Sequence, residues 1–298
     1  MRKLLIIVLV VLAVLIAAGV NGFAQEAEQY LLERGITYVV ADGVELKLDL
    51  ARPSTGKGPF PALIYLAGNG WGWYSEIDRG QHVSQIIDAA RDGYVAATVD
   101  YREAHRGETG ESKNPFPAQV YDVKAAVRWL RANAKKYDID PNHIGAAGWS
   151  SGGHLALMLG LTEASDGLEG DGANMNYSSR VQAVVSAGGP TELASCYKDS
   201  DSLKGIVGAF MGVSPEQAPD KYKTASPVTY VTRDDPPILL IHGDRDFEVP
   251  FSQAVLLEAR LQEAGVIHTL IVRKGGGHRD YLWDPEVLDF FDKYLKGQ

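Results

Sequence analysis

The 298-residue chain has only one cysteine, Cys196. A lone cysteine has no partner in its own chain, so the fold must be stable without a disulfide. The surrounding segment, ELASCYKDS, predicts neither a strand nor the start of a helix, the settings in which a nucleophilic thiol would be expected. We therefore expect Cys196 to be a small, half-buried side chain without a catalytic role.

Positive charge is also scarce. The chain has 29 lysines and arginines against 38 acidic residues, for a net charge of -9. Nucleic-acid binding needs clustered cations that neutralise phosphates, so this balance argues against a nucleic-acid partner. The acidity itself indicates no more than solubility.

Motifs for bound cofactors are missing from the sequence. It contains neither the phosphate-binding pattern G-x-x-x-x-G-K-[ST] nor the zinc-binding pattern H-E-x-x-H. Residues 163–180 are rich in Gly and Asp and predict an exposed loop, but the calcium-loop spacing D-x-[DN]-x-[DN]-G is absent. We expect no metal and no cofactor.

The first 24 residues differ from the rest. Two cations, Arg2 and Lys3, precede an apolar run from Leu4 to Ala18, and Gly22-Phe23-Ala24 offers small residues for cleavage. The run is shorter than the roughly 20 residues that span a bilayer. We predict a cleaved signal peptide at 1–24, a mature domain at 25–298, a secreted or periplasmic location and no membrane attachment after cleavage. An uncleaved anchor is the alternative.

The remainder alternates short apolar runs with helical patterns and has no repeat or long linker, which favours one domain. Runs that are apolar on both faces suit a parallel sheet covered by helices on each side. Residues 38–53 alternate around Asp42-Gly43 and predict an antiparallel hairpin. We therefore predict an α/β fold with an N-terminal β extension, whose core strands lie at 61–67, 93–101, 143–149, 181–189, 236–244 and 267–274.

Three helices have clear patterns. Residues 118–137 carry valines and leucines at three- and four-residue steps, with Lys135 and Lys136 in the last turn. Residues 286–295 predict the closing helix. The third helix is expected at 252–265, where Gly265 ends it, and its buried face should consist of Val255, Leu256, Ala259 and Leu261.

Residues 190–226 interrupt the alternation of strands and helices. They predict a cap-like excursion above the strand ends.

Ser150 lies in Gly148-Trp149-Ser150-Ser151-Gly152, between a predicted strand and an apolar helix. A sharp strand-to-helix turn strains the serine backbone and requires small residues two positions before and after it. It also places the serine at a helix N-terminus, where the helix dipole stabilises developing negative charge. We interpret Ser150 as a nucleophile.

A nucleophilic serine needs a base and an acid. His278 follows the C-terminal end of the last predicted strand, the edge at which catalytic groups gather in α/β sheets. His154 lies one helical turn beyond Ser150 and is expected to make a structural contact. Of the acidic residues after the preceding strand, we choose Asp246, because the tight turn should commit Asp244 to backbone bonding. The order Ser150, Asp246, His278 is that of α/β-hydrolases.

The chain resembles the esterase branch of the α/β-hydrolase superfamily, near the hormone-sensitive-lipase-like and bacterial feruloyl/acetyl esterase families. The resemblance spans about residues 38–295 and rests on the segments DYR (100–102), FPAQVYDVKAAVRWLRANAKKYDIDPNHIG (116–145), GWSSGGHLA (148–156), ASPVTYV (225–231), PPILLIHGDRDFEVP (236–250) and GGGHRD (275–280). It implies the triad Ser150, Asp246 and His278.

One segment departs from the branch. Where the branch has His-Gly-Gly-Gly-Trp, this chain has Ala67-Gly68-Asn69-Gly70-Trp71. The resemblance implies that the backbone N–H groups of Gly68, Asn69 and Ser151 form the oxyanion hole. Aromatic residues in the same regions are candidate walls of the substrate pocket: Trp71, Trp73, Trp149 and Trp283.

These residues predict an exported serine carboxylesterase that cleaves short-chain or aromatic acyl esters, with a carbohydrate-linked ester as the substrate implied by resemblance and export. The oligomeric state is left open. One alternative is a prolyl-oligopeptidase-like peptidase, which shares the turn and the triad order. The other is a catalytically inactive relative that acts as a binding protein, although all three triad residues are present.

Overall fold

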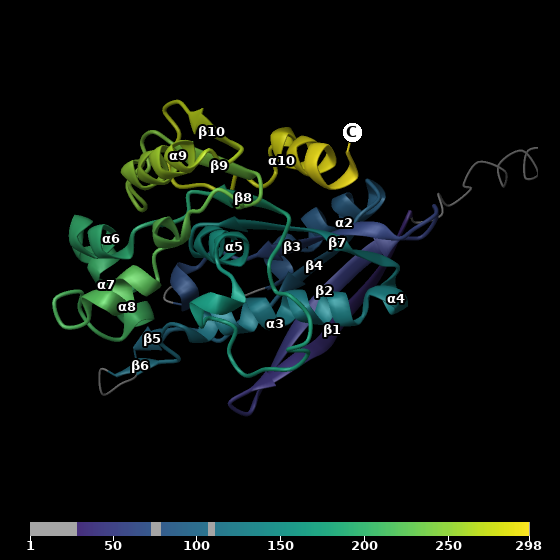
Figure 1. Ribbon diagram of the computed structural model, residues 1–298, viewed down its shortest axis with the longest axis horizontal. Coiled ribbons are helices and arrows are strands. Elements are labelled where there is room, and N and C mark those ends of the chain that lie inside the picture. The colour runs from purple at the N-terminus through teal and green to yellow at the C-terminus, as the bar shows by residue number, and fades with distance from the viewer. Residues whose placement is uncertain (1–28, 73–78, 107–110, 298) are drawn as a thin grey trace, which may run out of the picture.

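The computed structural model describes residues 29–72, 79–106 and 111–297. The proposed signal peptide and Trp73 therefore lie outside the described residues. The core is an eight-stranded sheet in the order β1-β2-β4-β3-β7-β8-β9-β10 (Figure 1). Its strands are β1 (Tyr30–Ala41), β2 (Val44–Pro53), β3 (Phe60–Leu66), β4 (Val95–Val99), β7 (Ile139–Trp149), β8 (Ala183–Ala187), β9 (Ile238–Gly243) and β10 (His268–Arg273).

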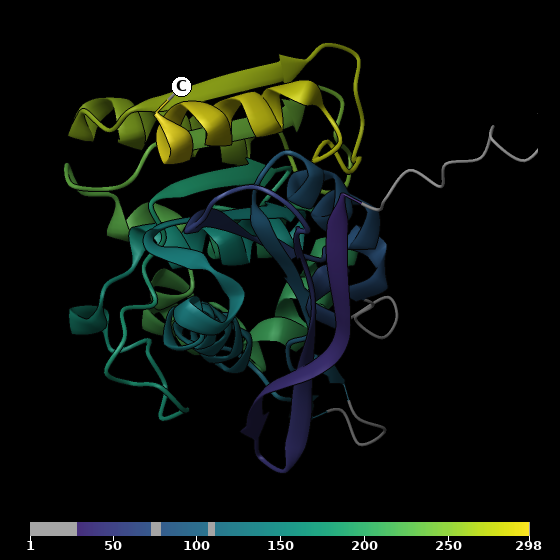
Figure 2. The same ribbon diagram turned by 90° about the vertical axis from the view of Figure 1, so that its right-hand side faces the viewer.

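The N-terminal hairpin forms as predicted. Asp42 and Gly43 join β1 to β2, and both have a positive φ, of 49° and 79°. Two successive residues with positive φ form a tight turn whose backbone twist matches the right-handed twist of the two flanking strands. β2 also pairs with β4 in the antiparallel direction, whereas β4, β3, β7, β8, β9 and β10 pair with one another in parallel. The long hairpin closes one edge of the sheet (Figure 2).

Helices cover both faces of the sheet, which explains why the central strands are apolar on each side. Helices α3 (Ala118–Ala132), α5 (Ser151–Leu161) and α9 (Ser252–Ala264) pack in the larger core, and α2 (Val83–Arg91) and α10 (Pro285–Phe291) pack in the smaller one. A five-residue π-helical turn, Asp292–Lys296, follows α10. The α/β-hydrolase fold predicted from the sequence is confirmed.

Two helical predictions need correction. The expected helix at 118–137 is divided at Asn133, and its last part is the short helix α4 (Ala134–Tyr137). In α9 the buried side chains are Gln253, Ala254, Leu257 and Leu261, while Val255, Leu256 and Ala259 are exposed.

Gln253 explains the shifted face of α9. Its side-chain oxygen accepts hydrogen bonds from the backbone N–H of Thr191, at 2.9 Å, and of Glu192, at 2.8 Å. A buried glutamine whose oxygen is satisfied in this way can take an inward position that apolar periodicity assigns to a hydrophobic residue.

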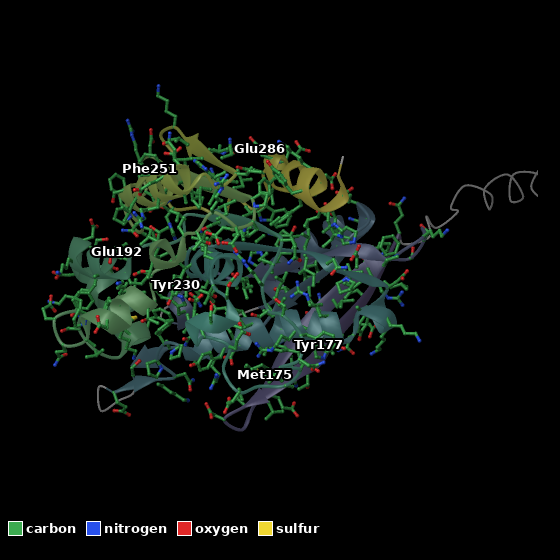
Figure 3. The ribbon with its side chains drawn as sticks, viewed as in Figure 1. Met175, Tyr177, Glu192, Tyr230, Phe251 and Glu286 are labelled. Atoms are coloured by element: carbon green, nitrogen blue, oxygen red, sulfur yellow. The ribbon has the colours of Figure 1, made fainter. Side chains whose placement is uncertain are left out.

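The excursion at 190–226 contains α6 (Leu193–Asp199), α7 (Asp201–Met211) and α8 (Pro219–Thr224), grouped beside the sheet in Figure 1. Glu192, labelled in Figure 3, caps α6 by accepting the N–H groups of Ala194 and Ser195. Cys196 lies inside α6, which begins at Leu193, and is fully buried, so the expectations that no helix starts nearby and that Cys196 is half-buried are wrong. Burial raises the pKa of its thiol, which keeps it un-ionised.

The Gly- and Asp-rich segment at 163–180 is anchored to α3 by a buried ion-pair cluster. Glu169 accepts hydrogen bonds from Lys124, at 2.7 Å, and Arg128, at 2.6 Å, and both cations are almost fully buried. Met175 and Tyr177 of this segment are partly exposed (Figure 3). The described part of the chain contains no cluster of three metal-binding side chains. None of its helices is long and apolar enough to cross a membrane.

Candidate active site

Ser150 occupies the sharp turn between β7 and α5. Its backbone angles, φ 54° and ψ -124°, are strained for a residue with a side chain, at a cost of about 1–3 kcal/mol. The backbone N–H of Ser150 donates to the carbonyl of Ala187 at 2.8 Å. The strained turn is thereby fixed to the neighbouring strand β8.

Gly148 and Gly152, on either side of Ser150, are required because the turn leaves no room for a side chain at either position. A Cβ on Gly148 would lie 2.1 Å from the carbonyl oxygen of Gly152, and one on Gly152 would lie 2.0 Å from that of Leu66. Both neighbours are backbone atoms, so a side chain could be accommodated only by moving the turn. This close packing is the physical reason for the Gly-x-Ser-x-Gly spacing.

His278 connects Ser150 to Asp246. Its Nε2 lies 2.9 Å from Ser150 Oγ, and its Nδ1 lies 2.7 Å from Asp246 Oδ2. The histidine stands in the loop after β10 and the aspartate in the loop after β9, so adjacent strands present both at the same edge of the sheet. The structure thus brings the three predicted residues together in a continuous chain of hydrogen bonds.

The carboxylate of Asp246 is buried and held by several donors. Its Oδ1 accepts the backbone N–H of Glu248, at 2.9 Å, and of Val249, at 2.8 Å. His242 Nε2 lies 3.4 Å from Oδ2. Burial raises the pKa of Asp246, but the hydrogen bonds from His242 and His278, the charge of His278 and the Val249 N–H outweigh it and hold the pKa below its usual value. Asp246 is therefore a carboxylate.

Asp244 accepts a backbone hydrogen bond, as expected, but the donor lies in another loop and not in its own turn. Its Oδ1 accepts the N–H of Gly275 at 2.6 Å, in the loop that carries His278. A Cβ on Gly243 would lie 2.3 Å from the carbonyl oxygen of Gly276. The loops of the acid and the base therefore pack directly on each other.

A pocket of about 450 Å³, counted with its open mouth, lies over Ser150 and His278. Apolar side chains of the cap and of the loop after β9 form one side: Leu203, Ile206 and Val249. Phe247 and Glu248 stand at the rim, and the side chain of Phe247 is 89% exposed. An apolar interior and a partly polar rim are the usual features of a small-molecule site.

Of the predicted oxyanion donors, Ser151 lines this pocket, whereas Gly68 and Asn69 are not among its lining residues. Ser151 is the first residue of α5, where a backbone N–H has no partner within the helix. The Asn69 N–H donates to Ser151 Oγ at 3.0 Å. Gly70, which the sequence did not single out, lines the pocket instead.

The tryptophans differ in their placement. Trp71 lines the pocket but is only 1% exposed, with its ring stacked on Phe210 of α7. The Trp149 ring lies 5.2 Å from the ring of His278 and is half-buried. Trp283 is 53% exposed and is not a lining residue. Of the three candidate tryptophans that the structure describes, Trp71 alone lines this pocket.

Sequence reasoning also missed His242 and Phe247. His242 donates its Nε2–H to the carbonyl of Val249 at 2.9 Å, beneath the acid, and its ring packs edge-on against Phe251, labelled in Figure 3. Both residues stand in the segment HGDRDFEVP, the histidine at the end of the predicted strand and the phenylalanine directly after Asp246. The pattern of this segment does not reveal which of its side chains turn inward.

A protein-family model matches the chain from residue 48 to residue 261, which includes the turn at Ser150 and the loop that carries Asp246. The chain belongs to the BD-FAE family. Esterase LipC of Mycobacterium tuberculosis is 33% identical over an alignment of 227 positions, which covers 68% of this chain and 49% of LipC. The chain spans about half the length of the M. tuberculosis esterases that it matches.

Solved structures extend the BD-FAE likeness to the fold. A truncated carbohydrate esterase from gut microbiota superposes with a TM-score of 0.77 at 30% identity, covering 90% of this chain and 98% of that one. Esterase 2 of the planctomycete Thermogutta terrifontis has a TM-score of 0.67 at 26% identity, covering 91% and 90%. These likenesses confirm the predicted esterase branch of the α/β-hydrolases.

Proposed function

We propose that this protein is an exported serine carboxylesterase. The observation that carries the proposal is the hydrogen-bonded sequence Ser150, His278, Asp246 beneath an open pocket. Serine is a weak nucleophile alone and becomes reactive when an adjacent imidazole can take its proton. The named esterases among the relatives support the same reaction class.

In the proposed reaction Ser150 Oγ attacks the ester carbonyl while His278 Nε2 takes the serine proton. Asp246 holds the Nδ1–H tautomer and stabilises the imidazolium. The carbonyl oxygen gains negative charge, and in this proposal the backbone N–H groups of Ser151 and Gly70 stabilise it. His278 then returns the proton to the leaving alcohol, and water releases the acyl group from Ser150 by the same route.

We propose Gly70 in place of Gly68 and Asn69 as the second donor. Gly70 lines the pocket with Ser150, and the Asn69 N–H is engaged by Ser151 Oγ. A Cβ on Gly68 would lie 2.4 Å from the carbonyl of Trp149, so this glycine serves the close packing of the two loops.

The substrate we propose is a short-chain or aromatic acyl ester of a carbohydrate. The space enclosed within the pocket, about 60 Å³ without its open mouth, suits a small acyl group rather than a long chain. A sugar alcohol would then lie at the rim, where Phe247 presents an aromatic face to solvent and Glu248 a hydrogen-bond acceptor. The structural neighbour named a carbohydrate esterase supports this assignment. Export is proposed from the signal-like residues 1–24.

The test compares residues 25–298 with the Ser150→Ala variant on p-nitrophenyl acetate, methyl ferulate, acetylated xylo-oligosaccharides and a p-nitroanilide peptide. We expect ester turnover that is lost in Ser150→Ala, and no peptide cleavage. Ester turnover that survives in the variant would contradict the mechanism. Hydrolysis of the anilide alone would favour the peptidase, and no turnover of any substrate would favour a binding protein.

A further inference from the structure

All three residues of the segment Gly70–Gly72 have a positive φ, and one of them, Trp71, carries a side chain. The φ angles are 59° at Gly70, 57° at Trp71 and 109° at Gly72. Glycine adopts such angles freely, but a tryptophan does so at a cost in free energy and only when its surroundings hold it there. Gly70 lines the pocket beside Ser150, so the conformation of Trp71 sets the position of a residue at the reaction centre.

Side-chain contacts hold Trp71 in this conformation. Its ring stacks on Phe210 of α7, with centroids 4.1 Å apart and planes 11° from parallel. Its indole Nε1–H donates to Nδ1 of His154 at 3.3 Å, and the two rings meet edge to face. Trp71 is therefore packed between α7 of the cap and α5, the helix that follows Ser150.

His154 is itself held in one tautomer. It is fully buried, and its Nε2 lies 2.8 Å from the carbonyl oxygen of Ala225, just after α8. A carbonyl can only accept, so Nε2 carries the hydrogen and Nδ1 is the acceptor for Trp71. One imidazole thus joins the strained segment, the helix of the nucleophile and the end of the cap.

We propose that His154 is a positioning residue of this site: by accepting the Trp71 N–H it holds Gly70–Gly72 in the conformation in which Gly70 faces the oxyanion. This role rests on the proposed esterase function. His154 is fully buried and does not line the pocket, so it acts through Trp71. The histidine that the branch carries at position 67 is an alanine here, and the indole contact of His154 supports the same loop from its other end.

Two substitutions separate positioning from packing. In His154→Asn the side-chain oxygen lies near the position of Nδ1 and can still accept from Trp71, but the donor to Ala225 is lost. In His154→Gln the amide N–H reaches toward Ala225, but the acceptor for Trp71 is lost. Each variant removes one buried hydrogen bond, so thermal unfolding should report similar losses of stability in both.

The experiment measures kcat and KM for p-nitrophenyl acetate in the wild type, both His154 variants and Trp71→Phe, which keeps a stacking ring but lacks the indole N–H. We expect kcat to fall about 10-fold to 100-fold in His154→Gln and Trp71→Phe, with KM within about twofold, because loss of alignment acts on the transition state. His154→Asn should retain most of kcat. The double variant Trp71→Phe/His154→Gln should be no slower than the slower single variant, since both remove the same contact.

Equal kcat in His154→Asn and His154→Gln, or losses that follow melting temperature alone, would overturn the positioning role and leave the esterase function intact. A wild-type enzyme without ester turnover would overturn the proposed function together with this role. The two failures are therefore distinguishable in one set of assays.

Discussion

Asp246 receives the backbone N–H of Val249 on the carboxylate oxygen that does not face His278. The Val249 bond to Oδ1 is 2.8 Å long, and His278 Nδ1 lies 2.7 Å from Oδ2. The loop backbone therefore orients the acid before any substrate binds. Since Oδ1 is committed to N–H donors, only Oδ2 is available to direct the imidazole.

This arrangement predicts the effect of Asp246→Asn. An amide can present an N–H to His278 and so favour the wrong tautomer of the imidazole, which leaves Nε2 unable to accept the serine proton. We expect kcat to fall about 10³-fold to 10⁴-fold with little change in KM. Steady-state kinetics on p-nitrophenyl acetate check this, with Glu263→Gln, an exposed carboxylate of α9 that does not line the pocket, as the control. A loss below tenfold would contradict the role of Asp246.

The buried state of His154 predicts a pH dependence of folding. Burial lowers its pKa from 6.5 to about 4, so the unfolded chain binds a proton between these values that the folded chain does not. The free energy of unfolding must then fall on acidification from pH 6.5 toward 4, by about 1.4 kcal/mol per pH unit at most. Urea unfolding of the wild type and His154→Gln across this range measures the difference. The variant should lose less stability with acid, and parallel curves would contradict the prediction.

The crowded serine turn predicts that Gly152→Ala is severely destabilising. Its Cβ would lie 2.0 Å from the backbone oxygen of Leu66, and backbone cannot move aside as a side chain can. Gly277→Ala is the control: it lies next to His278, but its Cβ would meet its nearest neighbour at 3.8 Å. We expect a loss of more than about 3 kcal/mol for Gly152→Ala and less than about 1 kcal/mol for Gly277→Ala, measured by urea unfolding. Similar values would contradict this account of the turn.

The exposed rim predicts a selective effect of Phe247→Ala. If the aromatic face supports a sugar at the rim, its loss should raise KM for acetylated xylo-oligosaccharides about fivefold to tenfold. This corresponds to about 0.9–1.4 kcal/mol, within the roughly 0.5–1.5 kcal/mol typical of aromatic ring contacts. KM for p-nitrophenyl acetate, which carries no sugar, should rise less than twofold. Exposed Leu256 on the surface of α9 supplies a control, Leu256→Ala, remote from the pocket lining. Equal effects on both substrates would contradict a sugar subsite at Phe247.

The sequence predicted most of the fold because its signals are local. Continuous apolar runs locate the central strands, Asp42-Gly43 locates the hairpin, and the glycines around Ser150 locate the strained turn. Chain order and the shared edge of a parallel sheet then select Asp246 and His278. These inferences need only periodicity, turn chemistry and topology.

The inward face of α9 and the burial of Trp71 could not be predicted in the same way. Gln253 turns inward because of two backbone N–H groups that lie 61 and 62 residues away in the chain. Trp71 is buried because α7 supplies Phe210 to stack on it. Apolar patterns within one segment carry no information about partners that the tertiary fold brings from another.

Covalent labelling followed by peptide mass mapping identifies the nucleophile directly, and we expect it to be Ser150. The wild type is treated with diisopropyl fluorophosphate, which forms a stable adduct with activated serines, beside Ser150→Ala and His278→Ala. We expect one adduct on Ser150 of the wild type, loss of ester turnover in proportion to labelling, and no adduct in either variant. An adduct on another serine, or ester turnover that persists in fully labelled protein, would contradict this expectation.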